Sequence, residues 1–158
     1  MTASTTIIIS SAGIGVILGL SALLVLPMQN QAFAAPTSIS GTLLGTLTCA
    51  DGSELRAYLE IGATVYPPQE GGEVEGRWVI YDFDNLIPVI HGQLDAGTIT
   101  NSGFFNLRGT VNSDFECSGS SPPYNMHITG DCGSDSEVKF RTEEGERGTF
   151  SGSVECNS

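Results

Sequence analysis

The chain has 158 residues, a length that suits one ordinary domain, and a formal net charge of −12 from 6 basic and 18 acidic side chains. Nucleic acids and anionic membrane surfaces attract proteins through clustered Lys and Arg, so this composition argues against both as partners. Every charged residue lies at or after Asp51. The acidic character therefore belongs wholly to the part of the chain that follows a neutral N-terminal region.

The N-terminal region predicts export from the cytosol. Residues 7–26 form an uncharged, mostly apolar run of about the 20 residues that a membrane-spanning helix needs. Small residues at the two ends of the AFA sequence at 32–34 match the positions that a signal peptidase reads. We therefore expect a hydrophobic targeting helix, with residues 1–34 as a signal peptide that is cleaved after Ala34.

An uncleaved membrane anchor is the alternative for residues 1–34. The segment has no Lys or Arg before its apolar run, and that run is longer than the usual core of a signal peptide. In this alternative the protein would contact a membrane only through the N-terminal segment. In both, residues 35–158 form one domain outside the cytosol.

Residues 35–158 have the pattern of short antiparallel strands. Apolar and polar residues alternate strictly over 54–61, which is typical of a half-buried strand, and clusters of Gly, Pro, Asn, Asp and Ser separate such segments. The expected strands lie at 39–48, 54–61, 77–83, 87–94, 103–111, 125–131, 137–141 and 147–155, with one more short strand at 98–100. About eight strands of this kind predict an all-β domain, either a small antiparallel β-sandwich or a β-barrel.

The segment RWVIYDF at 77–83 is apolar on both faces and contains the only tryptophan, so we expect a central strand covered on both sides. The alternation also predicts which residues form the core. They are Leu43, Leu47, Leu59, Trp78, Ile80, Phe105, Leu107, Ile128, Val138, Phe140, Phe150 and Val154.

The four cysteines predict two disulfides, because a small exported domain commonly uses cysteine in this way. The chain has no C-x-x-C pair, which a structural zinc site would usually contain. Disulfides require an oxidising compartment. We therefore expect a secreted or cell-surface protein.

Strand register favours one pairing of these cysteines. A three-residue turn at 143–145 places Phe140 opposite Gly148, since glycine at the last turn position adopts a left-handed conformation without steric cost. Continued along the strands, this register sets Cys132 opposite Cys156 and leaves Cys49 to pair with Cys117. It also sets Arg141 opposite Arg147, a like-charge pair that costs some stability, and the turn-like segment 133–136 could break it.

A second pairing stays open. The segments GTLLGTLTC at 41–49 and GTFSGSVEC at 148–156 share Gly, Thr, Gly and Cys at matching positions. Neighbouring first and last strands would favour a bond between Cys49 and Cys156, and Cys117 would then pair with Cys132.

Three oxygen-bearing residues beside one turn, Asp82, Asp84 and Asn85, form a candidate calcium site, because a hard cation needs converging oxygen ligands. The rest of an EF-hand loop is missing, with neither the Gly at its sixth position nor the Glu at its twelfth. The alternative is an ordinary turn in which an Asp side chain bonds to the backbone. We therefore expect no cofactor, with calcium at this turn as the alternative.

The two histidines, His91 and His127, alternate out of phase with their apolar neighbours and should face outward. They could share a metal ion or a proton only if their strands were adjacent. The chain has no G-x-S-x-G nucleophile motif. We therefore expect an exported, non-enzymatic β-domain that acts as a binding or structural module for an extracellular protein, glycan or small ligand; the alternative is a small secreted hydrolase or a calcium-dependent module.

Overall fold

The computed structural model describes residues 35–67, 72–114, 117 and 121–158. The apolar run at 7–26 and the expected cleavage site after residue 34 lie outside the described residues. No helix in the described part of the chain has the length and hydrophobicity that a membrane crossing requires.

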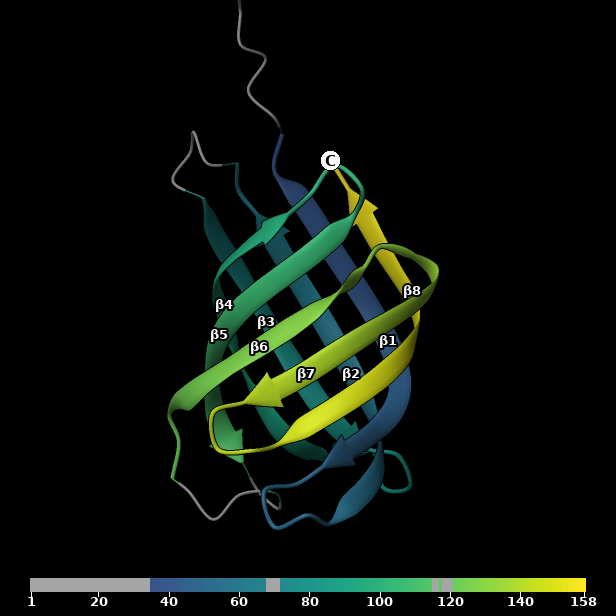
Figure 1. Cartoon of the computed structure of the whole chain (residues 1–158), viewed down its shortest axis with the longest axis vertical. Helices are drawn as coiled ribbons and strands as arrows, with labels where there is room; N and C mark the ends of the chain where they lie inside the picture. The colour runs from purple at the N-terminus through teal and green to yellow at the C-terminus, as the bar shows by residue number, and fades with distance from the viewer. Residues whose placement is uncertain (1–34, 68–71, 115–116, 118–120) are drawn as a thin grey trace, which may run out of the picture. The chain divides into compact units, whose positions relative to one another are not determined.

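Eight antiparallel strands form a closed barrel, in which each strand pairs with the next along the chain and the last pairs with the first (Figure 1). The strands are β1 (Thr37–Thr48), β2 (Glu54–Val65), β3 (Glu73–Asp82), β4 (Pro88–Ile99), β5 (Phe104–Asp114), β6 (Tyr124–Asp131), β7 (Gly133–Thr142) and β8 (Arg147–Asn157). The pairing of β1 with β8 decides between the two expected architectures in favour of the barrel. Closure also removes the free edges through which strands of other chains could add.

Two details of the expected strands are wrong. The segment 98–100 is no separate strand, because Thr98 and Ile99 are the last residues of β4. The strand that contains Trp78 is covered on one side only, since a barrel wall is a single layer. Val79 and Tyr81 accordingly lie half-buried on the outer surface of β3.

The barrel interior is filled by side chains, and all of the core residues expected from the alternation are buried there. Near the centre, the rings of Trp78 and Phe140 pack with their centroids 5.0 Å apart. Small barrels of eight strands have interiors just wide enough for such packing. The side chains that remain accessible to a ligand are therefore those on the outer wall and at the barrel ends.

Glycines on β1 and β8 make room for the large residues of the core. Four successive inward-facing pairs each join one glycine to one larger side chain: Gly41 with Val154, Leu43 with Gly152, Gly45 with Phe150, and Leu47 with Gly148. A Cβ atom on Gly45 would lie 2.7 Å from the Cα of Phe150, too close for any side chain. The similarity between segments 41–49 and 148–156 thus reflects two neighbouring strands with complementary patterns of small and large residues.

Two disulfides tie the barrel, Cys49 to Cys117 and Cys132 to Cys156, with Cα atoms 4.7 Å and 5.8 Å apart. This is the pairing that the register argument favours over its rival. Cys49 and Cys117 are buried, whereas Cys132 and Cys156 are half-buried at the opposite end of β1 and its neighbours.

The register itself is only partly continuous. It holds as expected from Arg141 opposite Arg147 as far as Ser136 opposite Gly152, and it then shifts by one residue before Gly133. Gly133 has a φ of 149°, which glycine adopts easily. The expectation of an unbroken register up to the cysteine is wrong: a bulge lies between Gly133 and Ser136, and Cys132, in the link between β6 and β7 just before it, bonds to Cys156 of β8.

A polar network closes one end of the barrel. The carboxylate of Glu146 is almost completely buried and accepts a hydrogen bond from the Thr142 hydroxyl, and its backbone N–H donates to the same hydroxyl at 3.2 Å. The Tyr124 hydroxyl lies 3.3 Å from the Glu146 carboxylate and donates to Asp114 at 2.7 Å. These bonds satisfy polar groups that would otherwise be costly to bury.

Candidate anion-binding site

The calcium candidate of the sequence is a turn in the structure. Asp82 ends β3, and its Oδ1 atom accepts hydrogen bonds from the backbone N–H groups of Asp84 and Asn85, both at 2.8 Å. This is the turn in which an Asp side chain bonds to the backbone. Among the described residues, no three His, Cys, Asp or Glu side chains are grouped in a way that could hold a metal ion.

The two histidines lie apart. His91 is on β4 opposite Ser113 of β5, whereas His127 is on β6 opposite Arg108 of β5. Strand β5 separates them, and Arg108 pairs on its other side with Ala96, five residues along β4 from His91. The structure therefore brings His127 together with arginines and not with the other histidine.

Three arginines and His127 form a continuous row across four strands. In the register, Arg108 of β5 is opposite His127 of β6, His127 is opposite Arg141 of β7, and Arg141 is opposite Arg147 of β8. All four side chains face outward: the arginines are exposed and His127 is half-buried. We call these four residues the arginine row.

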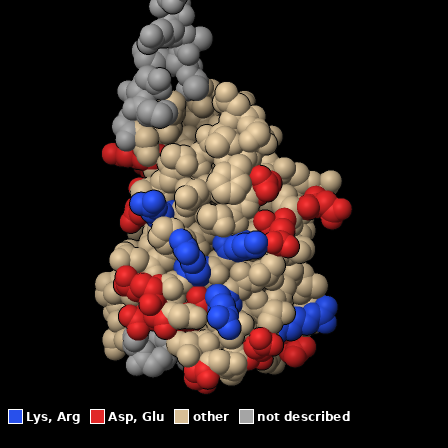
Figure 2. Space-filling view, in the orientation of Figure 1, with Lys and Arg blue, Asp and Glu red and all other residues tan. Residues whose placement is uncertain are grey.

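Basic side chains gather on this face of an otherwise acidic protein. Lys139 lies on β7 two residues before Arg141 and on the same outer side, so four of the six Lys and Arg residues of the chain stand on β5, β7 and β8. Figure 2 shows basic side chains grouped in the middle of the face that these strands present. A cluster of this sign is unexpected in a chain with three times as many carboxylates as cations.

The arginines of the row have no carboxylate partner in the described part of the chain. The one ion pair among the described residues joins Lys139 to Glu137 at 3.3 Å, on the exposed surface of β7. With respect to the described residues, each guanidinium thus keeps its planar set of N–H donors free of carboxylates, and such donors match the oxygens of carboxylate, sulfate and phosphate groups.

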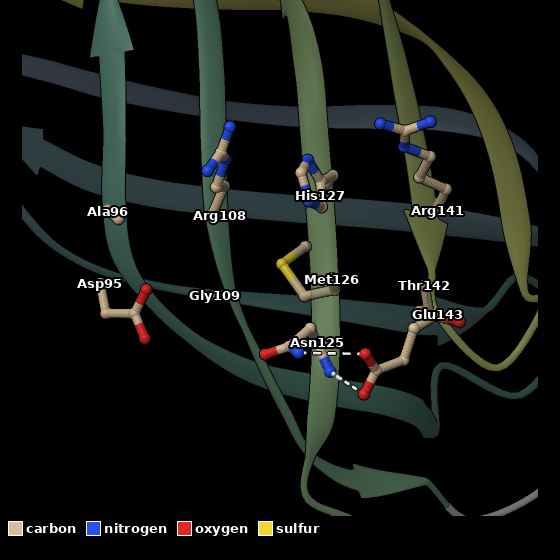
Figure 3. A pocket seen from close by; sticks show the side chains of 10 residues that line it. All are labelled: Asp95, Ala96, Arg108, Gly109, Asn125, Met126, His127, Arg141, Thr142 and Glu143. Carbon is tan, nitrogen blue, oxygen red and sulfur yellow. Dashed lines mark hydrogen bonds between the residues drawn. The ribbon is translucent and has the colours of Figure 1, made fainter.

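The acid in the turn just after β7, Glu143, is held away from the row. Glu143 accepts hydrogen bonds from the backbone N–H of Asn125 at 2.9 Å and from its side-chain amide at 3.0 Å. Figure 3 shows this carboxylate turned toward Asn125, while the guanidinium of Arg141 extends along the other side, near His127. The two hydrogen bonds lower the pKa of Glu143. Its carboxylate therefore stays charged, but it is hydrogen-bonded to Asn125 of β6 and not to the arginines.

His127 is held in its neutral form at neutral pH. Partial burial of the ring, and then the positive charges of Arg141 and Arg108, lower the pKa of His127 below its ordinary value of 6.5. A bound anion would reverse the effect of the two arginines and would favour the protonated imidazole. His127 therefore stands between two of the three arginines of the row, and its charge would depend on whether an anion is bound.

The row borders an open hollow of about 540 Å³ on the outer wall. Cationic side chains line one end of this hollow, and Asp95 and Glu143 line the other (Figure 3). The lining offers the N–H donors of Arg108, Arg141 and His127 on one side and the carboxylates of Asp95 and Glu143 on the other. The sequence predicted two parts of this site, the outward-facing His127 and the pairing of Arg141 with Arg147.

Comparison with known proteins finds no matching family model, no similar curated protein and no similar solved structure.

Proposed function

We propose that this protein is an exported binding module that holds an anionic ligand on the outer wall of its barrel, through the arginine row. One observation carries the proposal: Arg108, Arg141 and Arg147 line up with His127 across four strands and have no acidic partner in the described part of the chain. Like charges placed side by side in a sheet cost stability, and a bound anion would offset that cost.

The disulfides support a ligand found outside the cell. Two of them cross-link the barrel, as expected for a protein that works in an oxidising environment. Export through residues 1–34, either as a signal peptide or as a retained anchor, is part of this proposal.

The charge of the whole protein favours a short or sparsely charged ligand. The net charge of −12 repels a long, densely charged polymer such as nucleic acid, while the row attracts an anion locally. Asp95 and Glu143 border the row on one side and limit the width of the attractive region.

The test is an NMR titration of the ¹⁵N-labelled protein with inorganic sulfate at low ionic strength. We expect saturable shifts of the arginine Nε–H signals of Arg108 and Arg141 and of the His127 ring. The Arg108→Gln variant should lose this response. The Arg77→Gln variant, which removes one exposed charge from β3, should keep it. Small, unsaturable shifts spread over the whole barrel would contradict the proposal.

A further inference from the structure

We infer that the anionic ligand is an acidic glycan, carrying sulfate or carboxylate groups, that lies across strands β5 to β8. This inference rests on the proposed function and names the ligand class of the same site. It depends on the length of the arginine row, on the neutral polar residues beside the row and on one exposed aromatic ring.

The arginine row is longer than a single small anion. Neighbouring strands lie about 4.8 Å apart, so three steps from Arg108 to Arg147 span about 14 Å along the barrel wall. One sulfate or phosphate ion can bridge two adjacent positions at most. An elongated ligand with charges at intervals, running perpendicular to the strands, would engage the whole row.

The outer surface beside the row offers hydrogen-bonding groups for hydroxyls. One step along the strands from the row, successive register partners carry neutral polar or cationic side chains: Thr98 on β4, Asn106 on β5, Thr129 on β6, Lys139 on β7 and Thr149 on β8. Threonine hydroxyls both donate and accept hydrogen bonds, as sugar hydroxyls do, and the side-chain amide of Asn106, whose Oδ1 atom is buried, can donate. A ligand rich in hydroxyls and poor in charge suits this second row.

An aromatic ring stands on the same surface. Phe104 begins β5, faces outward like Asn106 and Arg108, and is 42% exposed. The flat apolar face of its ring can pack against the apolar face of a sugar ring. Strand β5 thus presents an aromatic ring, an amide and a guanidinium along one side over about 13 Å, so Phe104 would contact a different sugar unit from the one that binds Arg108.

These groups discriminate against other polyanions. An acidic peptide would engage the arginines but would have few hydroxyls for the threonine-rich row. A single-stranded DNA would engage the arginines through its phosphates but would bring no sugar hydroxyls along its length to the threonine-rich row. The acidic glycan is the class that uses the guanidinium, hydroxyl and aromatic groups at once.

The test compares heparin-derived oligosaccharides of increasing length with inorganic sulfate, poly-L-glutamate and an oligothymidylate, by calorimetry and NMR. We expect heparin affinity to rise with length until the row is covered and to exceed that of the other three ligands. The Arg147→Gln variant should lose the gain with length. Phe104→Ser should weaken heparin binding about 2- to 10-fold and leave the sulfate response unchanged. Thr129→Val, which removes one hydroxyl at nearly constant size, should also weaken heparin binding alone.

The outcomes separate the two claims. If sulfate binds at the row but long heparin fragments bind no more tightly, the glycan inference is wrong and the proposed function stands. Equal or tighter binding of poly-L-glutamate or oligothymidylate, indifferent to Phe104→Ser, would overturn the glycan in favour of an acidic peptide or a nucleic acid. If no anion binds at the row, both claims are wrong.

Discussion

Arg141 and Arg147 face each other directly across β7 and β8, although acidic residues outnumber basic ones by 18 to 6 in this protein. Opposed like charges in an antiparallel pair are destabilising. Natural proteins depart from favourable local pairing mainly at functional positions. The pair is therefore best understood as part of a surface that is completed by an anion.

Replacing Arg147 by threonine should stabilise the free protein and weaken the complex. Removing the repulsion with Arg141 should raise the free energy of unfolding by about 0.2–1 kcal/mol. The same change removes one donor of the row, so anion affinity should fall. Urea unfolding with and without the anion measures both effects. A less stable free protein would show that the pair is structural.

Anion binding should strengthen on acidification through His127. Its pKa in the folded protein lies below 6.5, so in the pH interval between that pKa and 6.5 the unfolded chain binds the proton and the free folded protein does not. This histidine therefore lowers the stability of the free protein as the pH falls through that interval. An anion raises the pKa of His127, so binding takes up a proton and tightens over the same interval.

NMR titration of His127, with and without sulfate, measures this coupling. The His127→Gln variant should bind with an affinity that hardly changes over this range, while the His91→Gln variant should retain the wild-type pH dependence. An unchanged His127 pKa in the presence of saturating anion would show that this histidine is not part of the anion-binding site.

Glu143 should weaken anion binding through its charge. The Glu143→Gln variant removes one negative charge beside Arg141 and keeps a side-chain oxygen that can accept from Asn125. We expect a higher affinity for heparin fragments than in the wild type. Glu155→Gln removes the same charge from the outer side of β8, at the end of that strand far from Arg147, and should have a smaller effect. Equal gains in affinity from both variants would show that Glu143 acts only through the net charge of the protein.

The core should tolerate no side chain at Gly92. This glycine is the register partner of Trp78, and an added Cβ would overlap the backbone carbonyl of Thr110 on β5 and lie 3.1 Å from Cζ2 of the indole ring. We expect Gly92→Val to cost at least about 1–3 kcal/mol by forcing β4 away from β5 and displacing the tryptophan. Gly62→Val is the matched control, because an added Cβ there meets no atom within 4 Å. Chemical denaturation compares them, and equal stabilities would contradict the packing.

The strands and the core were predictable because each depends on local pattern. A strand that faces the core on one side alternates apolar and polar residues along its own length, as β2 does over 54–61. The alternation could not predict whether one or both sides of the strand at 77–83 are covered by other elements. Val79 and Tyr81 are apolar enough for a buried strand, and only closure of the barrel leaves their side outside.

The site was harder to predict because it depends on the register of four strands. A three-residue turn fixes β7 against β8, so Arg141 opposite Arg147 could be derived. No such turn joins β5 to β6, where the chain runs through 115–123, and nothing in the sequence sets Arg108 opposite His127. The bulge between Gly133 and Ser136 shows how one residue can interrupt even a well-determined register.

The most direct test compares two double variants of equal net charge in calorimetric titrations with one heparin hexasaccharide. Arg108→Gln/Arg141→Gln removes two arginines of the row, and Arg56→Gln/Arg77→Gln removes two exposed arginines from β2 and β3. We expect the first variant to bind at least about tenfold more weakly than the second, because each charge-assisted hydrogen bond lost costs more than 1 kcal/mol. Equal affinities of the two variants would contradict a binding site at the arginine row.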